Sequence, residues 1–413
     1  MSTGDVVAIL IGVLVLGGIV LGIVLAVRRH RWIKGMREKG WEFVDSPHLA
    51  ITADLGCPPF GQGFVRKVDD QVLGQVGSPP VPFQMVEYHA RSFDDELAVL
   101  KLPFALPELY VCDGSTARVG CVGEVHPHPR WTVLTTDHAA ADAVLGACGP
   151  ALEALAATGH KVDLGIDGSN LVALSAPREA EHLDPFLQAL AGVAHGLATL
   201  ERHRVPEPAR PPFPFYRRPD WVYHGRRDDL LRTVRHQTGG FGHRAEHVLT
   251  GDSGQLPFIA LRHHWKTQTT VTTSDGRGGT TTRTQTNHHS EDLLEITLPA
   301  AWPFLLVGDA GWFAGGEKVE LESARFNELF DVRSDSPKLA YDVLHPRQME
   351  YLMQSRPPTF TLSGTVLRVS SSHDTEWIGH TLDVLTGFLA RVPGWVWKNL
   401  GVPEPSFTRP ELG

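Results

Sequence analysis

The sequence lacks the motifs that mark the commonest classes of enzyme. It has no GxGxxG or GxxxxGK(S/T) motif for nucleotide phosphates, no HExxH pair for a catalytic zinc ion and no GxSxG nucleophile elbow. Paired acids such as Asp69-Asp70 and Asp228-Asp229 are common on protein surfaces and carry no catalytic role without geometry. From the sequence we therefore assign no catalytic residue, no cofactor and no metal ligand.

Positive charge and cysteine are both scarce. The 38 Lys and Arg residues against 47 Asp and Glu residues give a formal net charge of -9, so we expect no nucleic-acid partner. The 4 cysteines show no CxxC spacing, and a chain of 413 residues needs no disulfide to form a core. We interpret them as ordinary thiols; they are Cys57, Cys112, Cys121 and Cys148.

The overall composition is that of a globular protein. Hydrophobic residues make up 42% of the chain, charged residues 21% and aromatic residues 8%, which argues against disorder and against a protein with many membrane spans. At the usual size of about 100–200 residues per domain, the chain has room for about two domains.

One segment departs from this average. Residues 6–27 form a run of 22 residues without a charged or strongly polar side chain. As a helix the run measures about 33 Å, close to a hydrocarbon core of about 30 Å. A cleaved signal peptide would have basic residues before a shorter run and a small-residue cleavage site after it, and none of these features is present. The run predicts a single transmembrane helix in contact with the lipid bilayer.

Basic residues follow this run and are absent before it. Only Asp5 precedes the run, whereas residues 28–40 contain Arg28, Arg29, Arg31, Lys34, Arg37 and Lys39 against one acid, Glu38. Because basic flanks stay on the cytoplasmic side, we expect a cell-membrane protein with its N-terminus outside and its main domain in the cytoplasm. The basic residues either set the orientation alone or also contact anionic lipids, through Arg28, Arg29, Arg31 and Lys34.

The rest of the chain contains an internal duplication. The clearest match aligns residues 102–111 with residues 298–307, where two prolines and several apolar residues are in register. Other matches occur in the same order: Trp41 with Trp221, Phe60-Gly61 with Phe241-Gly242, Val72-Leu73 with Val248-Leu249, Pro82-Phe83 with Pro257-Phe258, and Trp131-Thr132-Val133 with Phe330-Asp331-Val332. Each half then shows a strand pair around a glycine turn (162–174 and 360–369) and a helix (179–202 and 375–391).

A proline-rich stretch separates the two halves. Residues 206–219 contain 6 prolines, a density that blocks helix and sheet and predicts an extended linker, with a PxxP-type ligand as the alternative. The predicted organisation is an N-terminus and transmembrane helix (1–27), a basic juxtamembrane segment (28–40), repeat 1 (41–205), the linker (206–219), repeat 2 (220–400) and a tail (401–413).

Each half is expected to be an α+β module with an antiparallel sheet. Strand-like runs follow one another at turn-sized spacing, with helices in the middle and at the end of each half. Asp137 is a candidate N-cap for the middle helix of repeat 1. Ser336 and Pro337 start the corresponding helix of repeat 2. The fold-class prediction is therefore a transmembrane helix followed by a tandem duplication of this module.

The two halves differ most at a Thr-rich insertion, residues 267–286. Phe258 and Leu298 are 21 positions further apart than Phe83 and Leu102, and half of the residues in the insertion are threonine. Threonine favours strands, and the sequence SDGRGG at the centre favours a turn. We expect a protruding hairpin or an unstructured arm, which serves either as a site for a partner or for phosphorylation, or only as a surface loop.

Histidine is abundant, with 21 residues. His263-His264 and His288-His289 flank the insertion at its base. Adjacent residues of a strand point to opposite faces, so one histidine of each pair could converge, which gives two metal ligands without a third. The sequence leaves open whether these pairs bind metal.

Part of repeat 2 resembles a known family. The pattern consists of FNELFDVRSD at residues 326–335, then Ala340, Leu344-His345-Pro346 and Met349-Glu350. Over about 45 residues it resembles an uncharacterised family of bacterial membrane-anchored proteins, a domain of unknown function. The resemblance implies membrane attachment and no particular activity.

Two functions fit these features. The first is a non-enzymatic binding or scaffolding protein at the cytoplasmic face of the membrane, with a protein partner. The alternative is a ligand-binding receptor or an enzyme with a cleft between the two repeats, lined by residues such as His126, His128, His263 or Asp228.

Overall fold

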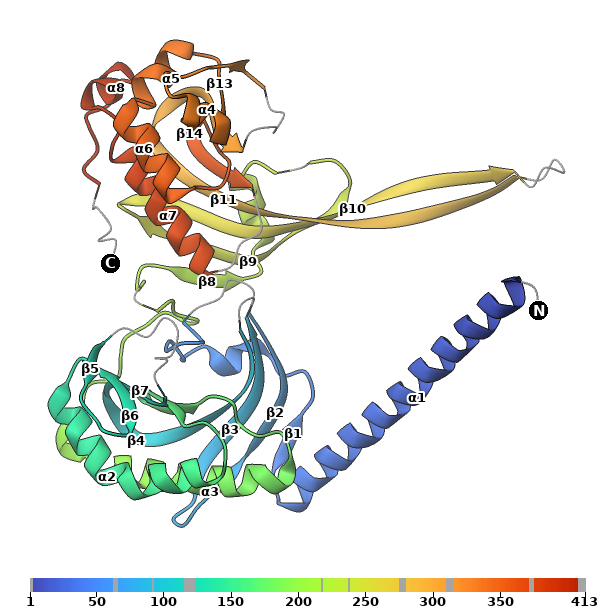
Figure 1. Cartoon of the computed structure of the whole chain (residues 1–413), viewed down its shortest axis with the longest axis vertical. Coiled ribbons are helices and arrows are strands. Elements are labelled where there is room, and N and C mark those ends of the chain that lie inside the picture. Colours follow the sequence, from blue (N-terminus) through green and yellow to red (C-terminus); the bar gives the residue numbers. More distant parts are fainter. Residues whose placement is uncertain are drawn as a thin grey trace. The chain divides into compact units, whose positions relative to one another are not determined.

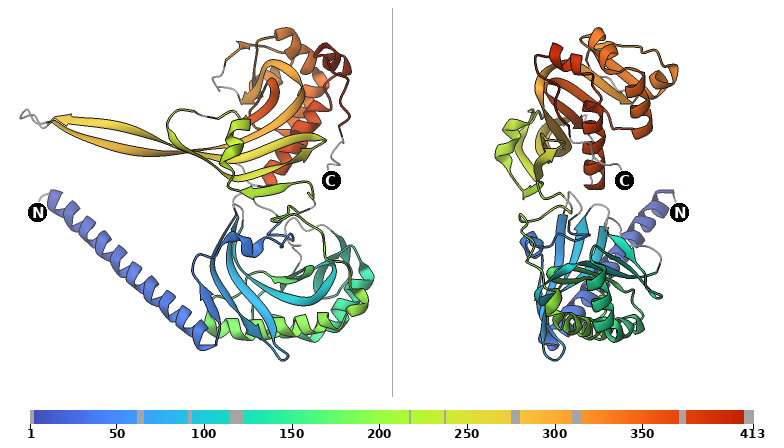
Figure 2. Two further views of the ribbon diagram at one scale, coloured as in Figure 1. Left: turned by 180° about the vertical axis from the view of Figure 1, so that it is seen from behind. Right: turned by 90° about the vertical axis from the view of Figure 1, so that its left-hand side faces the viewer.

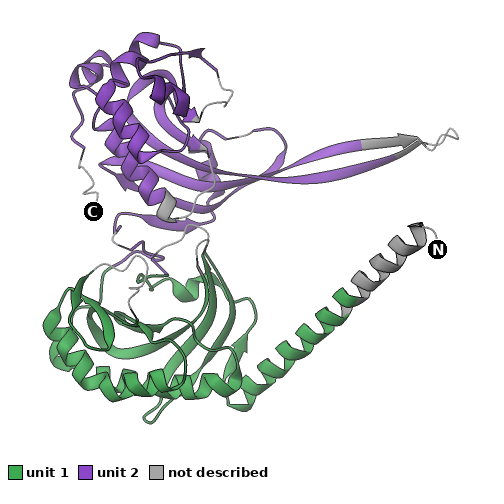
Figure 3. Cartoon of the chain, viewed as in Figure 1, with its two compact units in different colours: residues 1–59, 66–209 green, residues 60–65, 210–413 purple. Residues whose placement is uncertain are grey.

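The computed structural model describes residues 3–61, 66–90, 93–114, 123–216, 218–236, 238–274, 280–309, 315–370 and 375–407. The chain forms two compact units (Figure 3). Unit 1 comprises residues 1–59 and 66–209, and unit 2 comprises residues 60–65 and 210–413. The division at residue 209 lies within the proline-rich stretch 206–219.

Unit 1 consists of a long N-terminal helix, a sheet and two further helices (Figure 1). Its strands are β1 (Glu42–Val44), β2 (Arg66–Val76), β3 (Val81–Ala90), β4 (Phe93–Asp113), β5 (Glu124–His126), β6 (Trp131–Thr135) and β7 (Asp163–Ala173). Its helices are α1 (Thr3–Glu38), α2 (His138–Ala157) and α3 (Ala180–Ala198), with the short 3-10 helices η1 (Leu49–Thr52) and η2 (Glu201–His203).

Unit 2 repeats this plan with shorter, more numerous helices. Its strands are β8 (Val222–Gly225), β9 (Phe241–Ser253), β10 (Leu256–Ser274), β11 (Thr280–Asp309), β12 (Glu317–Lys318), β13 (Phe330–Ser334) and β14 (Phe360–Ser370). Its helices are α4 (Ala324–Leu329), α5 (Pro337–Val343), α6 (Pro346–Ser355), α7 (Thr375–Leu389) and α8 (Gly394–Asn399), with the 3-10 helix η3 (Asp228–Thr233).

The two sheets have the same topology. The sheet of unit 1 has the order β1-β2-β3-β4-β6-β5 with β7 paired to β4, and that of unit 2 has the order β8-β9-β10-β11-β13-β12 with β14 paired to β11. All of these pairings are antiparallel. The α+β class and the duplicated sheet module are therefore confirmed.

Packing in the two sheets is also duplicated. Trp41 contacts Phe83 edge to face at a ring distance of 5.1 Å, beside Gly74, where a Cβ atom would clash with both rings. The same three positions in unit 2 are Trp221, Phe258 and Gly251, with a ring distance of 5.0 Å. A glycine is needed at each site because the indole occupies the space of a side chain.

Strand β4 and strand β11 bend where their prolines lie. Pairing between β4 and β7 shifts register between Lys101 and Leu109, a stretch that contains Pro103 and Pro107. Proline has no backbone N–H and interrupts the ladder. The equivalent shift in β11 lies between Thr297 and Leu305.

The predicted strand pairs around a glycine turn are wrong. Each is a single strand, β7 or β14, that follows the bend of its long partner. The glycines are Gly168 and Gly364, and both have φ of 59°, a left-handed conformation that favours glycine. The prediction fails because a glycine at a bend within one strand and a glycine in a turn between two strands look alike in the sequence.

Two of the sequence matches are also corrected. Phe60 and Gly61 precede β2 and belong to unit 2, so they do not correspond to Phe241 and Gly242, the start of β9. The second match is displaced by one residue. Val72 pairs with Met85, whereas the equivalent pair in unit 2 is Leu249 with Ala260. A β-bulge precedes each pair, at the same place in both sheets.

The core of unit 1 lies between its sheet and the helices α2 and α3, which run side by side (Figure 2). Asp137 caps α2 as predicted, because its side chain accepts a hydrogen bond from Ala140 N at 3.0 Å. Among the helices whose side chains the structure describes, α2 is the one long and apolar enough to cross a membrane. It buries Val144, Cys148 and Leu152 in the core, as expected of a core helix.

Helix α1 contains the whole apolar run of residues 6–27 and extends to Glu38. Side chains of residues 1–16 and Ile19 lie outside the described part of the structure. The transmembrane assignment of this run therefore stays a prediction.

Candidate functional site

The C-terminal part of α1 is held on unit 1 by a buried carboxylate. The Arg29 guanidinium donates to both oxygens of Asp70, at 2.5 and 2.6 Å, and to Asp45 Oδ1 at 2.6 Å. The Asp70 side chain is 5% exposed and that of Asp45 is 73% exposed, so the contact with Asp70 is the one shielded from water. Hydrogen bonding to Asp70 raises the pKa of Arg29.

The position of Asp70 depends on the bulge in β2. Register shifts between Asp69 and Val72, and Asp70 adopts a φ of 45°. Aspartate tolerates this left-handed conformation better than most side chains. The bulge thus creates an irregular site where a carboxylate meets Arg29.

Apolar contacts complete the attachment of α1. Trp32 contacts Phe43 of β1 edge to face at 5.5 Å, and its indole N–H donates to the carbonyl oxygen of Arg178 at 2.5 Å. Met36 is fully buried in the core of unit 1. Lys39 forms an ion pair of 2.7 Å with Asp184 of α3. The last three turns of α1 are therefore part of the folded unit.

Arg178 connects this attachment to the sheet. Its guanidinium donates to Asp70 at 2.8 Å and to Glu87 at 3.0 Å, and it lies 3.2 Å from Glu96. Burial raises the pKa of Glu96 to about 7, against the attraction of Arg178. Three carboxylates and two arginines thus form one network, which we call the clamp: Arg29, Asp70, Glu87, Glu96 and Arg178.

The basic residues after the apolar run differ in their surroundings. Arg28 and Arg31 are exposed, and Lys34 forms an ion pair of 3.6 Å with Glu38, one turn further along α1. Arg29 belongs to the clamp instead. Contact of these residues with anionic lipid stays a prediction, and the structure adds an intramolecular role for Arg29.

The Thr-rich insertion forms a protruding two-stranded ribbon (Figures 1 and 2). Strands β10 and β11 stay paired from Phe258 with Ile296 to Ser274 with Thr280. Pairing with β9 ends at Lys266, and the described strands include no other partner for residues 267–274 and 280–287. We call these two stretches the arm, which extends about 27 Å at 3.4 Å per residue. Residues 275–279 lie outside the described part.

Three histidines meet at the base of the arm. His263 of β10 is fully buried, and its Nε2 lies 2.9 Å from Nδ1 of His243 on β9. The two ring planes are nearly parallel, with an angle of 11° between them, and the 5.1 Å between their centres shows that the rings meet edge to edge along this contact. The ring of His236, from the segment between η3 and β9, crosses that of His263 at 77° and 4.7 Å. One nitrogen of each ring lies within 4.8 Å of the others. We call this group the histidine cluster.

A carboxylate and an indole flank the cluster. His263 Nδ1 lies 2.9 Å from Oε1 of Glu291, its cross-strand neighbour on β11. Trp265 stacks on His263 at 4.9 Å and on His289 at 5.2 Å. Burial lowers the pKa of His263, although Glu291 acts in the opposite direction, so the imidazole is favoured in its neutral form.

Sequence reasoning found only one member of the cluster. It considered His263, but expected a second ligand from His288-His289 across the hairpin. The register places Glu291, not a histidine, opposite His263, and His289 opposite Trp265. His236 and His243 were missed. The available signal was that His243 lies near the start of β9 and His263 lies within β10, and that a short turn joins these two strands.

The other residues considered for a cleft have local partners. His126 lies 3.0 Å from His138 and 3.1 Å from Asp142. His128 Nδ1 accepts a hydrogen bond from Trp131 N at 3.1 Å. Asp228 forms an ion pair of 2.6 Å with Arg226. These contacts stabilise loops and strand ends, and a cleft between the repeats stays a prediction.

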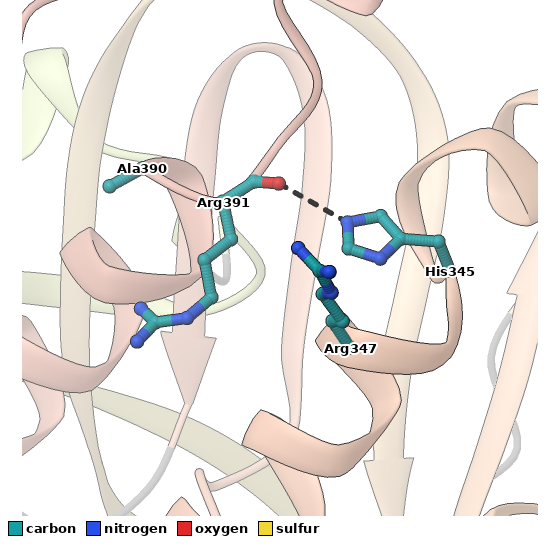
Figure 4. A pocket seen from close by; sticks show the side chains of 4 residues that line it. All are labelled: His345, Arg347, Ala390 and Arg391. Atoms are coloured by element: carbon teal, nitrogen blue, oxygen red, sulfur yellow. Dashed lines mark hydrogen bonds between the residues drawn. The ribbon is translucent and has the colours of Figure 1, made fainter.

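A hollow of about 440 Å³ lies in unit 2, lined by His345, Arg347, Ala390 and Arg391 (Figure 4). His345 Nε2 donates to the carbonyl oxygen of Arg391 at 3.3 Å. The Arg391 guanidinium points away from His345 and lies over the ring of Tyr351, 3.8 Å from its centre. The polar groups of this hollow therefore do not converge on one point.

The described cysteines offer little chemistry. Cys57, Cys112 and Cys148 are buried, and Cys121 lies outside the described residues. Burial raises the pKa of Cys148 to about 12, so it is a thiol at neutral pH.

No protein-family model matches the sequence, and no curated protein matches it significantly. Among solved structures, the crystal structure of the mycobacterial trehalose monomycolate transport factor A, TtfA, is similar to part of the chain. The similarity covers 42% of this chain and 89% of that one, at 9% identity and a TM-score of 0.29. Likeness at this level carries no conclusion about fold or function. The resemblance of residues 326–350 to an uncharacterised family stays a prediction.

Proposed function

We propose that the protein is a non-enzymatic binding protein anchored in the cell membrane by α1, with both units on the cytoplasmic side. The main support is the continuity of α1: one helix contains the apolar run 6–27 and, near its C-terminal end, buries Met36 in the core of unit 1. A flexible tether would only keep a domain near the bilayer. A helix fixed by the clamp would also set the orientation of unit 1 relative to the membrane.

The arm supports the binding role. Side chains of the arm such as Gln268, Thr270 and Thr284 are exposed, and among the described strands only β10 and β11 pair along it. An isolated two-stranded ribbon is marginally stable in water. Such a ribbon gains hydrogen bonds when an extended segment of another protein pairs with its edge. We therefore assign a protein partner to the arm, bound by strand addition.

Membrane insertion is tested by making the apolar run polar. The double variant Leu14→Arg, Leu16→Arg of the full chain places two arginines at the centre of the run. Each arginine raises the free energy of membrane insertion by about 2.5–3.5 kcal/mol. We expect the wild type to remain in the membrane fraction after an alkaline carbonate wash and the double variant to be released. Tyr341→Arg, at a half-exposed position of unit 2, is the control and should behave like the wild type.

Partner binding is tested with photocrosslinking residues placed in cells at Thr270 or Thr284, with Tyr341 as the control position. We expect a discrete protein adduct from the arm positions that is absent from the control and is lost when a proline is placed at Thr269. Equal adducts at all three positions would contradict a specific role of the arm.

A further inference from the structure

We propose that His236, His243 and His263 bind a single zinc ion at the base of the arm. Three segments supply the three imidazoles: the connection after η3, strand β9 and strand β10. One nitrogen from each lies within 4.8 Å of the others. Three histidines with a fourth position left for water or another ligand are a common zinc coordination set.

The distances are close to those of a zinc site, and the rings of His243 and His263 must turn so that their lone pairs meet at one point. Two nitrogens that each lie about 2.0–2.1 Å from a tetrahedral zinc ion are about 3.3 Å apart. His243 Nδ1 and His263 Nε2 are 2.9 Å apart, so this pair would open by about 0.4 Å. His236 would move inward by up to about 1.5 Å. Its segment is not part of a strand, which makes it the ligand best able to move.

The hydrogen bonds give the buried histidine the tautomer that a ligand needs. An ionised Glu291 only accepts hydrogen bonds, so His263 Nδ1 carries the proton that it donates to Glu291. The lone pair of His263 then lies on Nε2, the atom that faces His243. Zinc-binding histidines commonly donate their second N–H to a carboxylate in this way, which fixes the ring and raises its basicity.

His236 is oriented in a similar way. Its Nδ1 lies 3.3 Å from the carbonyl oxygen of Val234, which leaves Nε2 as its ligand atom. Because the lone pair of His263 lies on Nε2, His243 donates to it from Nδ1. To bind zinc through Nδ1, His243 must change to its other neutral tautomer, in which its own Nε2 carries the proton. No proton has to leave the cluster for the metal to enter.

The choice of metal follows from the ligands. Imidazole nitrogens suit zinc, copper and nickel, whereas calcium and magnesium require oxygen ligands. Zinc sites built from three histidines and an open fourth position are common, so we assign zinc and test copper and nickel beside it. Zinc has no geometric preference of its own and fits best.

Unit 1 provides an internal comparison. Tyr88 occupies the position of His263, because Phe83 and Phe258 are equivalent and each lies five residues earlier. Both side chains are fully buried. The duplicated sheet thus forms the same buried position twice, and only unit 2 places histidine there with two more histidines beside it. A bound ion would tie the segment before β9 to the strands that form the arm.

The test uses the full chain in detergent, carrying no histidine tag and stripped with EDTA. Zn²⁺ is titrated in competition with a chromogenic chelator, and Co²⁺ is added separately as a spectroscopic probe. We expect one Zn²⁺ per chain and an intense visible absorption from tetrahedral Co²⁺ that Zn²⁺ displaces.

The variants are His236→Ala and His243→Ala, at partly exposed positions, and Glu291→Gln. We expect each substitution to weaken Zn²⁺ binding at least about tenfold. Loss of a residue that only hydrogen-bonds to a metal ligand, as Glu291 does, already has an effect of this size. His264→Ala is the control, because His264 is the neighbour of His263 on β10 and pairs with Glu246 instead. Circular dichroism checks that each variant is folded.

The proposal is overturned if the wild type binds no Zn²⁺ more tightly than the His236→Ala, His243→Ala double variant. Equal affinity of the wild type and both single histidine variants would also overturn it, because zinc would then bind elsewhere. Tight Ni²⁺ or Cu²⁺ binding without Zn²⁺ binding would overturn the assignment to zinc.

Discussion

Arg29, on the helix that contains the apolar run, donates two hydrogen bonds to the buried carboxylate of Asp70 in strand β2. The two residues are 41 positions apart in the sequence. A bidentate arginine–carboxylate pair fixes direction as well as distance. The pair therefore fixes the direction in which the C-terminal part of α1 leaves the first sheet.

Removing the buried carboxylate should destabilise unit 1. Asp70→Asn leaves Arg29 and Arg178 without their shared partner, and we expect the free energy of unfolding to fall by about 2 kcal/mol. Asp45→Asn is the matched control: its side chain is 73% exposed, and its loss should cost less than about 0.5 kcal/mol. Urea unfolding of the full chain in detergent measures both, and equal effects would contradict the central role of Asp70.

The clamp should make stability depend on pH. The pKa of Glu96 rises from 4.5 to about 7 on folding, so between these values the folded state holds more protons than the unfolded state. The free energy of unfolding therefore falls as pH rises from about 4.5 to about 7, by an amount of the order of 3 kcal/mol. Glu96→Gln should flatten this dependence in urea unfolding at pH 5 and pH 8. If the free energy of unfolding of Glu96→Gln changed with pH as steeply as that of the wild type, the pH dependence would come from other groups.

Neither bend glycine should tolerate a side chain, and Gly168 should tolerate it less than Gly364, because a Cβ atom at Gly168 would also clash with Glu207 and Pro208. Gly168→Ala and Gly364→Ala each force alanine into a φ of 59°, and we expect a loss of about 1–2 kcal/mol. Gly146→Ala, on an open face of α2, should instead stabilise the protein by about 0.5–1 kcal/mol. If the three variants behaved alike in thermal unfolding, the bends would not depend on glycine.

The arm should be dispensable for folding. Unit 1 joins the equivalent strands β3 and β4 with Ala90 pairing directly to Phe93, so the module does not need the extra residues. We expect a variant that replaces residues 267–286 with a short turn to keep its circular dichroism spectrum and thermal midpoint. Loss of folding in this variant would show that the arm stabilises the sheet itself.

The duplicated sheet could be predicted because the matching residues of the two halves occur in the same order along the sequence. Proline pairs and aromatic residues recur in the same order, and their register survives in strands such as β4 and β11. The first residues of α2 and α5 were also predictable, since the Asp137 cap and Pro337 at the first helical position act within one turn of helix.

The candidate sites could not be predicted in the same way. The sequence does not distinguish an arginine that faces lipid after an apolar run from one that, like Arg29, binds a carboxylate on a distant strand. The histidine cluster depends on a bulged register between β9 and β10 and on a segment outside the sheet, which brings His236 over His263. A bulge shifts every later pair by one residue, and local composition does not reveal it.

The central claim is that α1 crosses the membrane and leaves both units in the cytoplasm. The most direct measurement fuses a fluorescent protein or alkaline phosphatase to the C-terminus of the full chain in bacterial cells. We expect a fluorescent fusion that stays with the membrane fraction and a phosphatase fusion that is inactive. An active phosphatase fusion, or a fluorescent fusion found in the soluble fraction, would contradict the account.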